Sequence, residues 1–255
     1  MIALKLRLIR EQNRIYTFLL KLLNFIQSNG PKVFIFHDIL DDISKVESQF
    51  AITESSFKKF IAYQLSQGNH PNIFEELSDI ILNKKKAQNN SFIVTFDDAN
   101  ESVYTKAYPF LQSHNIPFIV FITEALIGKQ NYLNLEQIKI LANDSLCTIG
   151  SHACHHVMFR NLSVEQTEDE LKESKLFLEK LTDKHVDCFA FPYGRIIECS
   201  CKNIELLKKS EFKFAFSAIS GNLNQSWLSS KFFLPRINVD EKLVDNLVPA
   251  NSKKE

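Results

Sequence analysis

Short apolar runs recur along the chain, and most end at a polar residue or a turn signal. They are rich in β-branched and aromatic residues and lack the alternation that marks a strand with one solvent-exposed face. Such runs suit strands buried on both faces of a parallel sheet. The predicted strands are KVFIF (32–36), SFIVTF (91–96), PFIVFI (117–122), CTIG (147–150), CFAF (188–191), KFAFS (213–217) and FFL (232–234).

Helical patterns lie between these runs. The clearest begins at Ser163, where Ser163 and Gln166 form a capping box ahead of apolar residues at helical spacing. A second pattern covers residues 101–113, and we expect a break at Pro109 because proline lacks a backbone N–H. This alternation of strands and helices predicts an α/β fold, either a barrel or an open doubly wound sheet.

The two ends of the chain differ from this alternating body. Residues 1–29 place apolar side chains at helical spacing, which predicts an amphipathic helical extension packed on the domain. Contact of residues 1–28 with a membrane surface or a partner is the alternative. No stretch there reaches the ~20 apolar residues of a membrane span and no cleavage site follows, so we expect a cytoplasmic protein. We expect residues 30–245 to form a single domain and residues 246–255 a flexible tail.

Charge and cysteine content exclude two classes of protein. The 255 residues include 30 Lys plus Arg and 30 Asp plus Glu, so the chain lacks the basic excess of a nucleic-acid-binding protein. Five cysteines, an odd number, argue against a secreted disulfide scaffold. All seven histidines lie before residue 186, and three of them fall within residues 152–156.

Two pairs of polar residues suggest chemistry. Asp97 and Asp98 follow the most apolar predicted strand, where adjacent carboxylates are costly to bury without a positive partner. A solvated turn with one aspartate capping the next helix is the alternative. His152 and His156 are separated by three residues, which lets both imidazoles reach one cation. His155 points elsewhere and is interpreted as a supporting residue or a bystander.

Together these two pairs predict a catalytic metal site. One carboxylate and two imidazoles leave coordination positions open, as in catalytic rather than structural zinc sites. The second carboxylate can then act as general base on a water molecule. Cys154 and the pair Cys199 and Cys201 offer a competing cysteine site, which we disfavour because no Cys-x-x-Cys pair is present.

Three motifs resemble those of the polysaccharide deacetylase family of carbohydrate esterases. They are TFDDANESVY (95–104), IGSHACHH (149–156) and FAFPYG (189–194), and the similarity extends over residues 32–240. The resemblance implies a distorted (β/α) barrel in a single catalytic domain. It also implies a divalent metal, commonly zinc, and removal of acetyl groups from N-acetylated sugars.

The resemblance also assigns roles to individual residues. Asp97 matches the catalytic base, and the metal ligands correspond to Asp98, His152 and His156. Tyr193 matches the residue whose backbone N–H helps to hold the oxyanion.

The sequence departs from the family pattern at three alanines. Ala99 stands in place of the usual glycine, Ala153 in place of Ser or Thr, and Ala190 in place of an arginine. LPRINVD (234–240) supplies another arginine, and we expect Arg236 to orient Asp97 instead.

The general acid needs a separate assignment, because the family's usual histidine near the C-terminus is missing here. A circularly permuted branch, which includes the poly-N-acetylglucosamine deacetylases, places this histidine on a strand before the Asp pair. KVFIFHDI resembles that branch and makes His37 the candidate acid; a structural histidine at a strand end is the alternative.

These expectations converge on metal-dependent hydrolysis of N-acetyl groups on an amino-sugar glycan, or on its precursor, in surface-polysaccharide metabolism. An esterase acting on O-acetyl sugars with the same site is the nearest rival. A non-catalytic carbohydrate-binding member of the family is a rival of another class, left open by the three alanines.

Overall fold

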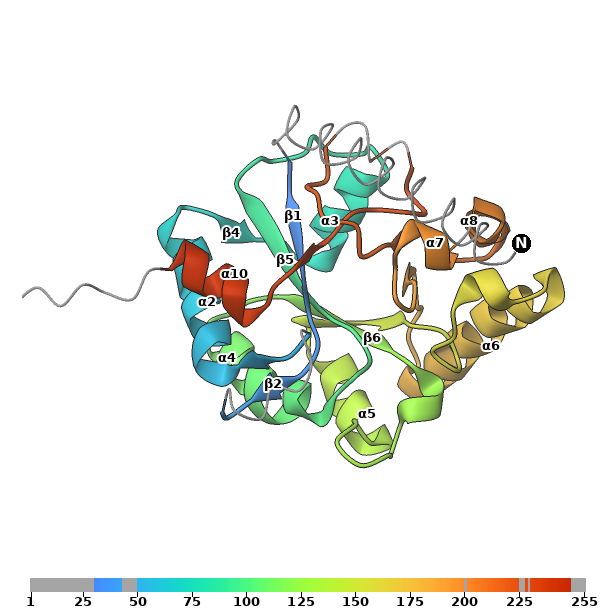
Figure 1. Cartoon of the computed structure of the whole chain (residues 1–255), viewed down its shortest axis with the longest axis horizontal. Helices are drawn as coiled ribbons and strands as arrows, with labels where there is room; N and C mark the ends of the chain where they lie inside the picture. Colours follow the sequence, from blue (N-terminus) through green and yellow to red (C-terminus); the bar gives the residue numbers. More distant parts are fainter. Residues whose placement is uncertain (1–29, 43–49, 200, 225–227, 229, 249–255) are drawn as a thin grey trace, which may run out of the picture.

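The computed structural model describes residues 30–42, 50–199, 201–224, 228 and 230–248, with Cys201 described through its backbone alone. The predicted N-terminal helix and the last seven residues lie outside the described residues. Figure 1 shows strands at the centre of the molecule and helices around them. No helix among the described residues is long and apolar enough to cross a membrane.

A curled parallel sheet forms the body of the fold. Its strands are paired in the order β10-β1-β5-β6-β7-β8-β9, with β4 paired to β5 beside this path and β2 paired to β3 in a separate small sheet. The strands are β1 Lys32–Phe36, β2 Ile39–Leu40, β3 Ile52–Thr53, β4 His70–Pro71, β5 Ser91–Phe96, β6 Phe118–Ile122, β7 Cys147–Ser151, β8 Cys188–Ala190, β9 Phe214–Phe216 and β10 Ile237–Asn238.

Helices connect these strands and cover the outside of the sheet (Figure 1). The α-helices are α2 Glu54–Ser66, α3 Phe74–Ile81, α4 Tyr108–Ser113, α5 Leu135–Asn143, α6 Val164–Thr182, α7 Ile196–Cys199, α8 Cys201–Lys209 and α10 Glu241–Leu247. Three short turns complete the list: a π-helical turn η2 Val103–Ala107 and two 3-10 turns, η3 Glu124–Leu126 and η4 Phe159–Asn161.

One short segment links the two edges of the sheet. Leu234 exchanges backbone hydrogen bonds with β9, because its N–H donates to Ala215 and its carbonyl accepts from Ser217. Only three residues later the chain pairs with β1 through β10, where Ile237 lies opposite Phe34. Contact with both edges curls the sheet into the distorted barrel that the sequence predicts.

The two faces of the sheet bury different sets of apolar residues. In β5, Ile93 belongs to the inner cluster, whereas Phe92 and Val94 belong to the cluster under the helices. The same division recurs in β6, where Phe121 lies with the inner set and Val120 with the outer set. Burial of both faces explains why these strands are apolar throughout, and it confirms the interpretation of the uninterrupted runs.

Some local predictions need correction. FFL (232–234) forms a turn with one bridge at Leu234 rather than a strand, and the edge strand is β10 instead. Pro235 lies between the two and cannot donate to a regular ladder.

The break expected at Pro109 takes the form of the π-helical turn η2, which ends just before α4. The capping box of Ser163 and Gln166 is confirmed at the start of α6. At the C-terminus, α10 continues to Leu247, inside the range predicted as tail.

Candidate active site

The predicted site residues gather at the carboxyl ends of the parallel strands. His37 follows β1, Asp97 follows β5 and His152 follows β7. Tyr193 comes three residues after β8. Arg236 is the exception, because it precedes β10 at the amino end of that strand and its side chain reaches Asp97 from there. Because parallel strands present their carboxyl ends at one edge, residues that are distant in sequence meet there.

Asp98, His152 and His156 form a cluster whose ligand atoms all lie within 4.8 Å of one another. Oδ1 of Asp98 lies 3.0 Å from Nε2 of His156 and 3.4 Å from Nε2 of His152. This oxygen is buried, yet it has no hydrogen bond of good geometry to any described residue. Three potential ligand atoms therefore face a common point, where a cation would satisfy the buried oxygen.

The protonation states of His152 and Asp98 also suit the binding of a cation. Nδ1 of His152 lies 2.7 Å from the carbonyl oxygen of Ala190, which can only accept, so Nδ1 carries the proton and Nε2 can offer a lone pair. Burial opposes ionisation of Asp98, but His152 and His156 more than offset it and hold the pKa of that carboxyl well below its usual range. A carboxylate and imidazole nitrogens are ligands that zinc accepts, so the three residues fit a divalent cation.

Asp97, the neighbour of Asp98, is held by Arg236 through both of its carboxylate oxygens. The two guanidinium NH groups of Arg236 donate to the two carboxylate oxygens of Asp97, each at 2.7 Å. Arg236 is fully buried, and its Nε donates to the Ser217 carbonyl at 2.9 Å. Burial raises the pKa of Asp97, but Arg236 reverses this and the pKa lies below its usual value. The predicted contact between Arg236 and Asp97 is confirmed.

His37 lies at the same end of the sheet. The charged groups that act on its pKa are Asp97, Asp98, His152 and Arg236. Its Nδ1 is buried and has no hydrogen-bond partner among the described residues, while its ring packs beside Phe50 with centroids 5.0 Å apart. Burial lowers the pKa of His37, against the opposing pull of the two aspartates. The structure therefore brings the candidate acid to the candidate base.

A left-handed backbone marks five residues of the site. Their φ angles are 67° at Asp98, 65° at Ala99, 67° at Ala153, 52° at His156 and 63° at Tyr193. Residues with a side chain rarely adopt this conformation, and it persists where the surroundings over-determine it, often at functional sites. Ala99, at the position where the family usually has glycine, therefore keeps a backbone that glycine would adopt without strain.

Tyr193 presents its backbone and its ring differently. Its N–H donates to no acceptor among the described residues, as a group reserved for a ligand would. Its ring is 47% exposed and packs on His156 with centroids 4.8 Å apart. The ring thus covers one side of a candidate metal ligand and faces solvent with the other.

Glu170 of α6 is a site residue that the sequence interpretation missed. Its carboxylate contacts the loop between the two histidines, at Cys154 and His155. A signal was available, because Glu170 lies on the helix stripe that also carries Leu171 and Leu178, and an acidic residue on a buried stripe needs a partner. His155, interpreted as a supporting residue or a bystander, is the partner.

A cysteine metal site finds little support in the described structure. Cys154, His155 and Glu170 do cluster closely enough to share an ion. However, both Glu170 oxygens already accept hydrogen bonds from this loop, and burial together with nearby carboxylates raises the pKa of the Cys154 thiol far above neutrality. A protonated thiol is a poor metal ligand. Cys199 is buried as a free thiol, and its burial likewise raises its pKa.

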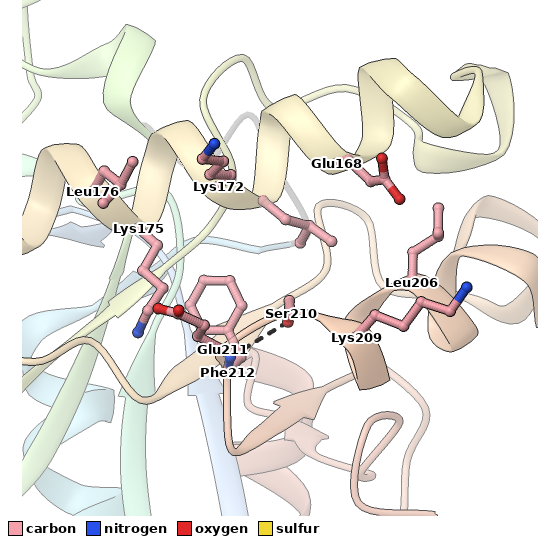
Figure 2. A pocket seen from close by; sticks show the side chains of 10 residues that line it. Glu168, Lys172, Lys175, Leu176, Leu206, Lys209, Ser210, Glu211 and Phe212 are labelled. Atoms are coloured by element: carbon pink, nitrogen blue, oxygen red, sulfur yellow. Dashed lines mark hydrogen bonds between the residues drawn. The ribbon is translucent and has the colours of Figure 1, made fainter.

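A cavity of about 350 Å³ lies away from this site, between α6 and α8 (Figure 2). Lys175 is its most buried cation; its amino group donates to the Val186 carbonyl at 2.6 Å and pairs with Glu179 at 3.0 Å. That charge is therefore satisfied within the protein, and none of the candidate catalytic or metal-binding residues lines the cavity.

Comparison with known proteins places these observations in a family. The family model for polysaccharide deacetylases matches residues 84–215, just over half of the chain. Poly-beta-1,6-N-acetyl-D-glucosamine N-deacetylases of Staphylococcus aureus are 26% identical over 224 residues, covering 80% of this chain and 73% of theirs.

Solved structures share the fold. IcaB from Ammonifex degensii superposes with a TM-score of 0.74 at 22% identity, covering 86% of this chain and 95% of its own. The Streptococcus pyogenes deacetylase PplD, solved in complex with acetate, gives a TM-score of 0.73 at 19% identity, covering 86% and 96%. The distorted single-domain barrel predicted from the motifs is thereby confirmed.

Proposed function

Because the chain belongs to the polysaccharide deacetylase family, we propose that it is a metal-dependent hydrolase that removes N-acetyl groups from an amino-sugar glycan. The observation that carries this proposal is the pairing of the Asp98, His152 and His156 cluster with an Asp97 that Arg236 keeps ionised. One aspartate is thus available as a ligand and its neighbour as a base.

The metal would be held by Asp98, His152 and His156. A divalent cation there, zinc first, would supply a Lewis acid for the acetyl carbonyl and lower the pKa of the attacking water toward ~7. Asp97 would accept the proton of that water, and its lowered pKa keeps it ready to do so at neutral pH.

Two further groups would act on the acetyl amide. The Tyr193 N–H would donate to the oxyanion as the carbonyl becomes tetrahedral, and one such donor is typically worth about 3 kcal/mol. His37 would give its proton to the departing amine nitrogen, because an unprotonated amide nitrogen is a very poor leaving group. These roles follow the resemblance position by position.

The substrate is proposed from chemistry and from the relatives. The S. aureus relatives are named for a β-1,6-linked N-acetylglucosamine polymer, which makes N-acetylated amino-sugar glycans of surface polysaccharides the first class to test. The cytoplasmic location and the contact through residues 1–28 stay predictions.

Acetate release from N-acetylglucosamine oligomers, with zinc added to metal-stripped protein, tests the proposal directly. Asp97→Asn should abolish release while still binding zinc, because the asparagine cannot accept the proton. Asp169→Asn, an exposed change on α6, is the matched control and should keep full activity. Full activity of Asp97→Asn would remove Asp97 as the base, and a wild-type protein that binds no divalent metal would favour the non-catalytic alternative.

A further inference from the structure

We propose that Glu170 is a positioning residue that holds the loop between His152 and His156 in the shape that metal binding requires. The inference rests on the proposed function, because it assumes that these two histidines are ligands. Glu170 comes from α6, outside the three motifs of the family resemblance, and its carboxylate acts through the loop backbone and the His155 ring.

The contacts of Glu170 span the centre of the loop. Its Oε2 accepts hydrogen bonds from the N–H of Cys154 at 2.8 Å and from the N–H of His155 at 3.1 Å. Its Oε1 lies 2.6 Å from Nδ1 of His155. The residue is only 9% exposed, so these bonds form where water competes poorly. Charge-assisted bonds of this kind are stronger than neutral ones.

The loop needs such a partner because its backbone is strained. Ala153 and His156 both adopt the left-handed conformation, one on each side of the two residues that Glu170 binds. Two successive N–H groups directed at one oxygen fix the peptide planes between them. The direction in which the chain leaves toward His156, and hence the position of its imidazole, therefore depends on this carboxylate.

A second tie from α6 supports the start of the same loop. The Oγ of Ser174, one helical turn after Glu170, lies 2.8 Å from the Oγ of Ser151, which in turn accepts from the N–H of Ala153 at 3.2 Å. His152 itself is fixed by the Ala190 carbonyl. Among the described residues, no backbone carbonyl holds the His156 ring in this way, so Glu170 is the side chain best placed to set the approach of the chain to His156.

The test measures metal affinity rather than turnover. Zinc is titrated into metal-stripped protein, and the Kd is compared among wild type, Glu170→Ala, Glu170→Gln and Glu168→Ala. Loss of a residue that holds the metal ligands in place typically lowers metal affinity 10–100-fold, and we expect a rise in Kd of that size for Glu170→Ala. Glu170→Gln keeps one oxygen for the two N–H groups and should lie closer to wild type. Glu168→Ala, an exposed change on the same helix, should leave the Kd unchanged.

Two further readouts separate positioning from a general loss of stability. Hydrogen exchange of the Cys154 and His155 amides in the metal-free protein should accelerate in Glu170→Ala while the β5 and β6 amides stay protected. At saturating zinc, kcat should recover toward the wild-type value, which a globally unfolded variant would not show. If Glu170→Ala does not fold, the Kd and amide exchange of Glu170→Gln carry the comparison.

The outcomes are distinguishable. A wild-type Kd in both Glu170 variants would overturn the positioning role and leave the proposed function intact. A wild-type protein that binds no divalent metal, zinc included, would overturn the proposed function, and this inference would fall with it. A raised Kd in Glu170→Ala together with an unchanged Kd in Glu168→Ala would support the role.

Discussion

The guanidinium of Arg236 donates hydrogen bonds to both carboxylate oxygens of Asp97, although the two residues lie 139 positions apart in the chain. Arg236 also lies over the rings of Phe121 and Phe216, 5.3 and 5.7 Å from their centroids, so its charge is held inside the barrel against the inner apolar cluster. The pair exists because β10 pairs with β1 and β1 pairs with β5, which brings the Arg236 side chain within reach of the residue that follows β5.

Arg236→Met should therefore damage both stability and activity. Breaking one partner of a buried pair typically costs about 3–5 kcal/mol, because the other charge is left buried alone. Burial would then raise the pKa of Asp97, so the acidic limb of kcat/KM against pH should move to higher pH. Denaturant unfolding and the pH profile measure the two effects, with Arg160→Met as an exposed control.

The sign of the stability effect follows from the same pKa. Asp97 has a lowered pKa in the folded protein, so its contribution is fully present above the unfolded value of about 3.9 and is lost as pH falls through the folded value. The stability difference between wild type and Arg236→Met should thus shrink in strong acid. A difference that is the same at pH 7 and at low pH would contradict this account.

Sequence patterns predicted the strands well because burial on both faces leaves a local mark. Every residue of SFIVTF is buried, and that run is β5. The segment around Leu234 has no comparable sequence pattern, because its pairing with both edges of the sheet is decided by tertiary contacts. Pro235 also interrupts any regular ladder there. The same limit explains the misplaced strand at residues 232–234.

The site residues also differ in how far the sequence could predict them. Asp98, His152 and His156 could be predicted as a cluster because their spacing and the resemblance both indicated it, and the structure brings them together. The partner of Asp97 was predicted from a motif, and the contact is observed. Glu170 was missed because a helix residue's partner across the fold depends on how α6 packs, which periodicity alone does not reveal.

Metal binding should stabilise the protein measurably. A ligand that binds only the folded state adds about 2.7 kcal/mol at a concentration of 100 Kd. Zinc added to metal-stripped wild type should raise the unfolding temperature, and His156→Ala should lose most of this increase because it removes one ligand. The exposed His114→Ala serves as control. An equal increase in wild type and His156→Ala would show that zinc binds elsewhere.

The exposed ring of Tyr193 should contribute to sugar binding. Its inner face packs on His156 and its outer face is open to a ligand, and an aromatic ring offers a flat apolar surface to a sugar. We expect Tyr193→Leu to raise KM about tenfold, equivalent to about 1.4 kcal/mol, with kcat little changed. Tyr193→Phe keeps the ring and should behave as wild type. A fall in kcat at constant KM in the leucine variant would instead indicate a disturbed His156.

His37 offers the sharpest separation between amide and ester hydrolysis. An amine leaves only if its nitrogen is protonated, whereas an alkoxide leaves more readily, so a general acid matters more for the amide. His37→Ala should reduce acetate release from N-acetyl substrates by about 10²–10⁴-fold, the usual contribution of such a group, and affect O-acetyl substrates much less.

The control for this variant is His185→Ala, whose side chain is 93% exposed. Zinc affinity must be measured for both variants, because the buried ring of His37 senses the charges of Asp97 and Asp98 and its loss could disturb the metal site. Equal losses on amide and ester at unchanged zinc affinity would place His37 in a step common to both reactions. Full amide turnover would make it a structural histidine at the end of β1, because no leaving-group proton would then depend on it.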